Sequence, residues 1–167
     1  MKIELSTKEN LKDILNIINQ AKLYMKENGI NQWNKDYPKI ESLENDILNK
    51  NSYVVKDNDK IIGTFVLVFG NEKNYQKIEG SWKTDIPYGT LHRVAVDNSF
   101  KGKGVAGFIL EFAETMAREK NIFSLRIDTH KDNLSMRRFI KKSGFDFCGI
   151  IYVEDGSPRV AFEKILK

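Results

Sequence analysis

Apolar residues recur every three or four positions in four stretches of the chain, and this spacing predicts amphipathic helices. The clearest stripe spans residues 105–117, a second spans 11–25, and shorter helices are predicted over 42–48 and from about 133 to 142. The apolar positions of the clearest stripe are Val105, Phe108, Ile109, Phe112, Ala113, Met116 and Ala117. These four segments are the predicted helices of the fold.

Local signals mark where two of these helices begin or end. Ser6 and Glu9 have the Ser-x-x-Glu spacing of a capping box, in which each side chain bonds to the backbone of the other residue. We therefore expect the first helix to start just after this pair and to stop at Gly29. Gly144 is the expected stop of the last helix, because glycine readily adopts the left-handed conformation that ends helices.

Short runs rich in β-branched and aromatic residues predict strands between the helices. The predicted strands are residues 2–5, 52–56, 61–69, 90–96, 122–127, 145–153 and 159–165. Residues 57–59 (Asp-Asn-Asp) read as a hairpin turn, whereas residues 70–88 give no assignment. Helices mixed with strands indicate an α+β fold (an α/β three-layer domain). The helix between the strands at 90–96 and 122–127 is long enough to be a crossover, so these two strands should be parallel neighbours.

Composition narrows the class of protein. A chain of 167 residues without a linker or repeat predicts one domain over 1–167, and 41% hydrophobic with 30% charged residues is typical of a globular protein. The net charge of +4 is spread along the chain and not gathered in a stripe, so we expect no nucleic-acid partner. No apolar run is long enough for a membrane helix, and Met1 to Leu5 lack the apolar core of a signal peptide. The single cysteine, Cys148, excludes an internal disulfide, and we expect a cytoplasmic protein without a metal site.

The segment 94–107 carries the strongest chemical signal. A predicted strand runs into a loop that contains Gly102 and Gly104 and opens directly into the longest predicted helix. A helix N-terminus has unpaired N–H donors and a partial positive charge, so this segment is suited to a phosphate or pyrophosphate. Lys101 and Lys103 add positive charge beside it. The plainer alternative is a glycine-containing turn with solvated lysines.

Two common nucleotide motifs describe this segment poorly. Gly102, Gly104 and Gly107 match the G-x-G-x-x-G dinucleotide fingerprint in form, but five residues separate the strand from the first glycine. No Gly-Lys-Ser/Thr follows at the spacing of a Walker motif. A nicotinamide-dependent oxidoreductase is thus the weaker interpretation.

Two linked motifs resemble those of the GNAT superfamily of acetyl-CoA-dependent N-acetyltransferases. Lys101-x-x-Gly104-x-Ala106 is similar to the Arg/Gln-x-x-Gly-x-Gly/Ala signature that follows a strand and precedes a helix, although lysine replaces the first residue. Asn133, followed by a helix and then Gly144-Phe145, is similar to a second signature. The resemblance is closest over 90–150. It implies a mixed, mostly antiparallel sheet of six to seven strands with a splayed parallel pair, flanked by about four helices.

The resemblance also implies how acetyl-CoA binds. Backbone groups of the central strand, from Val94 through Ala95 to Val96, would bond the pantetheine arm as an added strand does. The loop that holds the pyrophosphate would comprise Lys101, Gly102, Lys103, Gly104, Val105 and Ala106. Asn133 would bond the pantetheine arm, and it is also a plausible helix N-cap.

Three residues are candidates for the chemistry. The backbone N–H of Val94 is the expected donor to the acetyl carbonyl oxygen, as in the family. His92 lies two residues earlier, so regular strand alternation would place both on one face, and histidine is a suitable general base. The alternative is a structural histidine. The family's usual general acid is a tyrosine, but Ile140 occupies that position, which leaves Tyr152 or water as the proton donor.

The amine acceptor should be bound by aromatic residues in irregular segments, with core packing as the alternative for each. These residues are Trp33, Tyr37, Trp82 and Tyr88. Acidic residues that would attract a cationic amine are Glu41, Asp85, Glu154 and Asp155, and the sequence does not rank them. The prediction is an N-acetyltransferase, monomeric or homodimeric, that acts on a primary amine of a small molecule or peptide by direct transfer in a ternary complex. The alternative is a silent module that binds or senses acyl-CoA, which the missing tyrosine at Ile140 motivates.

Overall fold

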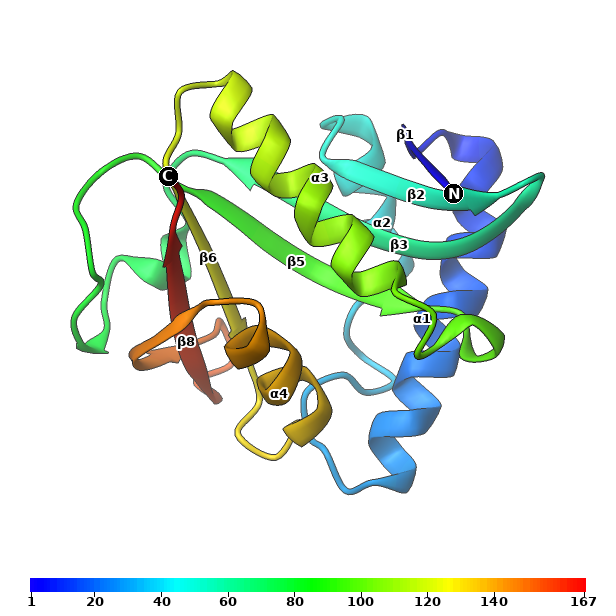
Figure 1. Ribbon diagram of the computed structural model, residues 1–167. Helices are drawn as coiled ribbons and strands as arrows, with labels where there is room; N and C mark the ends of the chain where they lie inside the picture. Colours follow the sequence, from blue (N-terminus) through cyan, green and yellow to red (C-terminus); the bar gives the residue numbers. More distant parts are fainter. The chain divides into compact units, whose positions relative to one another are not determined.

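The computed structural model describes residues 1–167 and contains four helices and eight strands (Figure 1). The helices are α1 (Leu11–Glu27), α2 (Ile40–Leu48), α3 (Val105–Glu119) and α4 (Leu134–Lys142). The strands are β1 (Lys2–Leu5), β2 (Ser52–Asp57), β3 (Lys60–Phe69), β4 (Glu79–Gly80), β5 (Gly89–Val96), β6 (Ser124–Thr129), β7 (Asp146–Tyr152) and β8 (Pro158–Ile165). The predicted mixed α+β class is confirmed.

The strands form one sheet in the order β1-β2-β3-β5-β6-β8-β7-β4. The pairs β1–β2, β2–β3, β4–β7, β6–β8 and β7–β8 are antiparallel. The pair β5–β6 is parallel through Gly89↔Leu125 and Thr90↔Arg126, as the long crossover between these strands predicts. The sheet is therefore mostly antiparallel, with one parallel pair.

Two details differ from the sequence prediction. The sheet has eight strands, not six to seven, because β4 is a two-residue strand that lies in the unassigned segment 70–88 and is too short to show a periodicity. The capping box at Ser6 and Glu9 was also a wrong prediction. The backbone N–H of Thr7 donates to Asn10 Oδ1 at 2.9 Å instead, and Ser6 is buried, where it accepts a hydrogen bond from the Ser52 hydroxyl at 2.8 Å.

The contacts between Cα atoms group the chain into two compact units. The first unit comprises Met1–Leu67 and His92–Phe112, and the second comprises Val68–Leu91 and Ala113–Lys167. The single domain over 1–167 stays a prediction.

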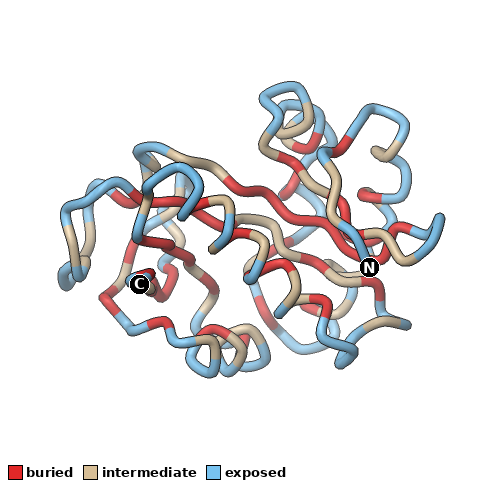
Figure 2. Tube along the Cα trace, turned by 45° about the horizontal axis from the view of Figure 1, so that its top comes forward, coloured by how far each residue is buried: buried red, intermediate tan, exposed pale blue.

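In the first unit, helices cover both faces of β2 and β3 (Figure 1). Ile14, Ile17 and Ile18 of α1 pack with Val54 of β2 on one face, together with Leu43 of α2. On the opposite face, a Cβ atom at Gly63 would lie 3.2 Å from Val105 of α3, so the missing side chain lets this helix approach the strand closely. The rings of Tyr53, Phe65 and Phe112 complete that face. Figure 2 shows that burial is concentrated in the strands and on the inner sides of the helices.

In the second unit, a buried carboxylate organises the segment between β3 and β5. Glu163 of β8 is fully buried, and its carboxylate accepts hydrogen bonds from the Ser124 hydroxyl at 2.6 Å, the Thr84 hydroxyl at 2.7 Å and the Lys83 backbone N–H at 2.6 Å. Arg126 Nε lies 3.4 Å from the same carboxylate. Burial alone raises the pKa of Glu163, but these hydrogen bonds and Arg126 outweigh it, so the pKa is lowered.

The guanidinium of Arg126 is held by aromatic rings. Its central carbon lies 4.2 Å from the ring centroid of Trp82 and 3.9 Å from that of Tyr88. One of its N–H groups donates to the Thr84 carbonyl at 2.6 Å. Segment 82–88, which has little regular structure, is therefore ordered by its side chains and by the ion pair beneath it.

Replacing Glu163 with glutamine tests this network. We expect Glu163→Gln to lower the free energy of unfolding at pH 7 by about 3 kcal/mol, because the donors and Arg126 lose their buried partner charge. Since the pKa of Glu163 is lowered in the folded state, the advantage of the wild type should be present at neutral pH and shrink as the pH falls below about 4.5, the ordinary value for glutamate. Urea denaturation followed by circular dichroism measures both effects. The exposed Glu154→Gln variant is the control, and equal stability of the two variants at pH 7 would contradict the account.

Candidate active site

The loop between β5 and α3 is anchored by Asp97, which is buried in the first unit. Its backbone N–H donates to the Ile62 carbonyl of β3 at 2.9 Å, and its carboxylate accepts hydrogen bonds from the backbone and hydroxyl of Ser99. Gln20 of α1 adds a two-sided contact, since its side-chain N–H donates to Asp97 at 3.3 Å and its oxygen accepts from the Asn98 backbone at 2.7 Å. The bonds from Ser99 hold the pKa of Asp97 below its usual range. The start of the loop is therefore fixed to both β3 and α1.

Beyond this anchor, the backbone curls through two glycines in the left-handed region. The φ angles are +77° at Gly102 and +83° at Gly104, and a Cβ atom at either position would have no heavy atom within 4 Å. Helix α3 then begins at Val105, and the N–H groups of its first turn have no acceptor within the helix. The open space, the free donors and the helix N-terminus together fit a pyrophosphate.

Lysine side chains add positive charge around this loop. Lys101 Nζ lies 4.3 Å from the ring centroid of Tyr24, and Lys103 and Lys60 each lie 5.0 Å from that of Phe100. These aromatic contacts do not neutralise the ammonium groups, but Lys60 Nζ also lies 3.8 Å from Asp97 Oδ1, so its charge is paired. The predicted phosphate-binding segment 101–106 is thus assembled as one structure within the first unit.

Strand β5 contains an irregularity at Arg93, whose φ angle of +50° is uncommon for a residue with a side chain. Arg93 Nε lies 3.2 Å from Asp46 Oδ2 of α2, and the guanidinium lies 5.7 Å from the ring centroid of Tyr37. Burial raises the pKa of Asp46, and the charges of Arg93 and His92 oppose that effect. The ion pair and the ring contact together hold the unusual backbone conformation in place.

His92 and Val94, the predicted base and carbonyl donor, flank this irregular residue, and both are half-buried. The prediction that they share a face assumed regular alternation along the strand. A left-handed residue between them breaks that alternation, so the shared face and both catalytic roles stay predictions.

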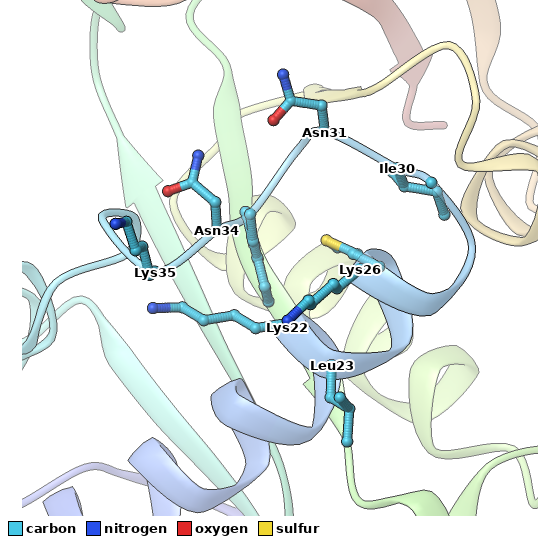
Figure 3. Close-up of a pocket in the computed structure, with 10 residues that line it drawn as sticks. Lys22, Leu23, Lys26, Ile30, Asn31, Asn34 and Lys35 are labelled. Carbon is cyan, nitrogen blue, oxygen red and sulfur yellow. The ribbon is translucent and has the colours of Figure 1, made fainter.

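The predicted acceptor residues of the first unit lie in the segment after α1. Trp33 is buried and lines a cavity of about 610 Å³ beside the end of α1, and the close-up in Figure 3 shows this cavity. Tyr37 is exposed, but its ring faces Arg93. Tyr37 does not line this cavity, and the role of both residues in binding the acceptor stays a prediction.

Four further candidates lie in the second unit. Asn133 is buried and caps α4, because its side-chain oxygen accepts from the Met136 N–H at 3.3 Å. The Tyr152 hydroxyl donates to Glu79 at 2.9 Å, and this bond raises the pKa of Tyr152. Trp82 and Tyr88 contact Arg126, as described above. The N-cap interpretation of Asn133 is confirmed, and the roles of all four in binding or catalysis stay predictions.

Two further residues of the second unit, Ile140 and Cys148, are buried. Ile140, at the place of the family's usual tyrosine, is a fully buried residue of α4. Cys148 is buried as well, and burial raises the pKa of its thiol. Ile140 has no proton to donate, and the buried thiol of Cys148 is poorly placed to act as a nucleophile.

Three contributors to the site went unrecognised in the sequence: Gln20, Arg93 and Asp97. Gln20 lies far from the loop along the chain and has no motif around it. The φ angle of Arg93 has no signature in the sequence, since glycine is the usual residue in that conformation. Asp97, directly followed by Asn98 and Ser99, gave the one available signal, because such residues favour side-chain bonds to their own backbone.

None of the helices combines the length and the apolar character that crossing a membrane requires. No group of three or more histidine, cysteine, aspartate or glutamate side chains is placed to hold a metal ion.

Comparison with known proteins agrees with this geometry. The crystal structure of a GNAT-family acetyltransferase from Streptococcus agalactiae 2603 superposes with a TM-score of 0.89 at 29% identity, covering 99% of this chain and 95% of the other. Streptothricin acetyltransferase from Escherichia coli is 28% identical over 78 residues, which are 46% of this chain and 45% of that protein. The uncharacterized N-acetyltransferase YesJ from Bacillus subtilis (strain 168) is 32% identical over 74 residues, 44% of this chain and 39% of that protein. The chain thus spans less than half the length of the curated relatives it matches.

The family comparison covers a larger part of the chain. The model described as acetyltransferase (GNAT) family matches residues 13–145, which include β5, the glycine loop and α3. This match extends over well more than half of the 167 residues and agrees with both motifs in the sequence. The chain belongs to the GNAT family of acetyltransferases.

Proposed function

We propose that this protein is an N-acetyltransferase that transfers the acetyl group of acetyl-CoA to a primary amine by direct transfer in a ternary complex. The observation that carries the proposal is the β5–loop–α3 segment. Its two glycines have positive φ angles and open space beside them, at the N-terminus of a long helix. The amine belongs to a small molecule or a peptide.

The residues of the first unit fit the cofactor in two parts. Backbone N–H groups of the glycine loop and of the first turn of α3 would hold the pyrophosphate, except that of Lys103, which donates to the Phe100 carbonyl at 3.3 Å. The side chains of Lys101 and Lys103 would lie beside it. Backbone groups of Val94 and Val96 would bond the amides of the pantetheine arm, as an added strand does. When bound, acetyl-CoA supplies the activated acetyl thioester. Asn133 keeps the role that the family resemblance implies, as a separate prediction.

The chemistry requires a neutral amine and a donor to the carbonyl oxygen. His92 would accept the proton that the amine loses, directly or through water, while the amine nitrogen forms a bond to the acetyl carbon. The Val94 N–H would donate to the carbonyl oxygen, and the C–S bond breaks as the amide forms.

The departing thiolate needs a proton, and the fully buried Ile140 has none to give. Tyr152 is the candidate in the second unit. Its hydroxyl is protonated at neutral pH, as in any tyrosine, and it donates to Glu79, a bond that raises its pKa and makes it a weaker acid. Water is the alternative donor.

The buried Ile140 also supports a second candidate function, an acyl-CoA-binding module without transferase activity. Thiol release from acetyl-CoA, measured with a panel of amines, separates the two. The panel should include streptothricin, since one relative is named for it, with aminoglycoside, polyamine and peptide amines. Release that depends on one of these amines supports the enzyme, and tight CoA binding without release from any of them supports the silent module.

Gly104→Val tests the loop. A β-branched side chain at φ +83° would distort the backbone donors and fill the space beside them, so we expect the affinity for CoA to fall at least about tenfold. Isothermal titration calorimetry measures the affinity. Gly156→Val is the matched control, because Gly156 has a φ of +84° and equally open surroundings in the turn after β7. If both folded variants bound CoA like the wild type, the loop assignment would be wrong.

His92→Gln tests the base. We expect unchanged CoA affinity and a turnover lowered by roughly 10²-fold, because glutamine cannot accept the proton of the amine. The acidic limb of the pH–rate profile should also flatten, since the titrating group is gone. Steady-state kinetics across pH measure both effects, and His130→Gln, the other histidine of the chain, is the control. A merely structural His92 would instead lower stability and leave the acidic limb in place.

A further inference from the structure

The cavity beside the end of α1 combines an apolar floor with a polar rim. Its volume is about 610 Å³, within the range of small-molecule sites. Met25, Ile30 and Trp33 line it and are all buried, so they form the floor. The side chains of Asn31 and Asn34 add amide groups at the rim. Such a site suits a ligand with an apolar body and a small number of polar groups.

The charge of the rim has one sign. Lys22, Lys26 and Lys35 line the cavity, and no acidic residue does. Figure 3 shows the Lys22 side chain extending from α1 toward the side of the view on which Lys35 lies. Burial lowers the pKa of Lys22 and the negative charge of Asp36 opposes this effect, but the two side chains form no ion pair. The cavity is thus complementary to an anion and not to a bare cation.

One of these lysines is fixed in position. Lys22 is half-buried, and its ammonium donates to the Pro38 carbonyl at 2.8 Å. An ammonium has three donors, so this bond leaves two for a ligand. Lys26 and Lys35 are exposed and have no ion-pair partner. A ligand anion would therefore meet one positioned and two mobile ammonium groups.

The cavity wall is connected to the proposed catalytic strand within the first unit. Asn34 and Tyr37 exchange two backbone hydrogen bonds, at 2.9 and 3.2 Å. The ring of Tyr37 faces Arg93 of β5, which lies between His92 and Val94 in the chain. The segment that lines the cavity is thereby held against the strand that carries the proposed base.

We propose that this cavity binds the body of the acceptor, and that the acceptor is a primary amine carrying a carboxylate or phosphate on an apolar, ring-sized group. The inference rests on the proposed function for the identity of the ligand as an acceptor. The lysines recognise the anion, the floor packs against the apolar group, and the amine is the end that is acetylated. The acidic residues considered for attracting a cationic amine are not part of this cavity.

Binding of matched amines to the wild-type protein tests the inference by calorimetry. The first pair compares the carboxylate para-(aminoethyl)benzoate with the corresponding amide, para-(aminoethyl)benzamide. The second pair compares tyramine O-phosphate with tyramine, which lacks the phosphate. We expect at least one anionic member to bind about tenfold more tightly than its neutral partner, because charge-assisted hydrogen bonds are the stronger ones. The pair that shows the difference identifies the anion. Equal affinities within both pairs would overturn the inference.

A double variant tests the role of the lysines. In Lys26→Gln/Lys35→Gln, the preference for the anion should fall below about threefold. Lys8→Gln/Lys12→Gln, with two exposed lysines replaced outside the cavity, has the same net charge and should keep the preference. A preference retained in both variants, or lost in both, would overturn the inference.

CoA affinity, measured on the same samples, separates this inference from the proposed function. Bound CoA without any anion preference contradicts the cavity assignment and leaves the proposed function intact. An anion preference in a protein that does not bind CoA contradicts the proposed function and the acceptor role. The lysines would then recognise the anion of a ligand whose amine is not acetylated.

Discussion

The buried carboxylate of Asp97 fixes the point at which β5 ends and the glycine loop begins. This carboxylate accepts hydrogen bonds from Ser99 and Gln20, and the backbone N–H of Asp97 donates to the Ile62 carbonyl of β3. The loop beyond it can therefore expose N–H donors without support from a side-chain core. A flexible loop would lose conformational entropy each time it bound an anion, and the bonds to Asp97 reduce that loss by fixing where this loop starts. The proposed cofactor site depends on this anchor.

A second constraint lies four residues before Asp97, at Arg93 within β5. The left-handed backbone at Arg93 is held by Asp46 of α2 and by Tyr37 of the segment after α1. One strand thus connects the proposed pyrophosphate loop, the proposed base and the wall of the cationic cavity. A change at Arg93 would alter its contact with Tyr37, whose backbone is hydrogen-bonded to Asn34 of the cavity wall.

The sequence predicted those features that arise from local patterns. The helices follow from apolar spacing, and the glycine loop from two glycines before the clearest helix. The sequence missed features that arise from contacts distant along the chain, such as the clamp of Gln20 on Asp97 and the Glu163 network that orders residues 82–88. It also assumed strict alternation through β5, which the conformation of Arg93 interrupts. The positive rim of the cavity could not be predicted from the sequence. Its lysines lie both on α1 and in the loop after it, and only folding brings them together.

The most direct test of the account compares acetyl-CoA with S-acetylpantetheine, which lacks the nucleotide and pyrophosphate, by isothermal titration calorimetry on the wild-type protein. The account predicts that acetyl-CoA binds below millimolar concentration and that S-acetylpantetheine binds at least about tenfold more weakly, because the loop between β5 and α3 recognises the pyrophosphate. Absence of acetyl-CoA binding at millimolar concentration, or equal binding of the two compounds, would contradict it.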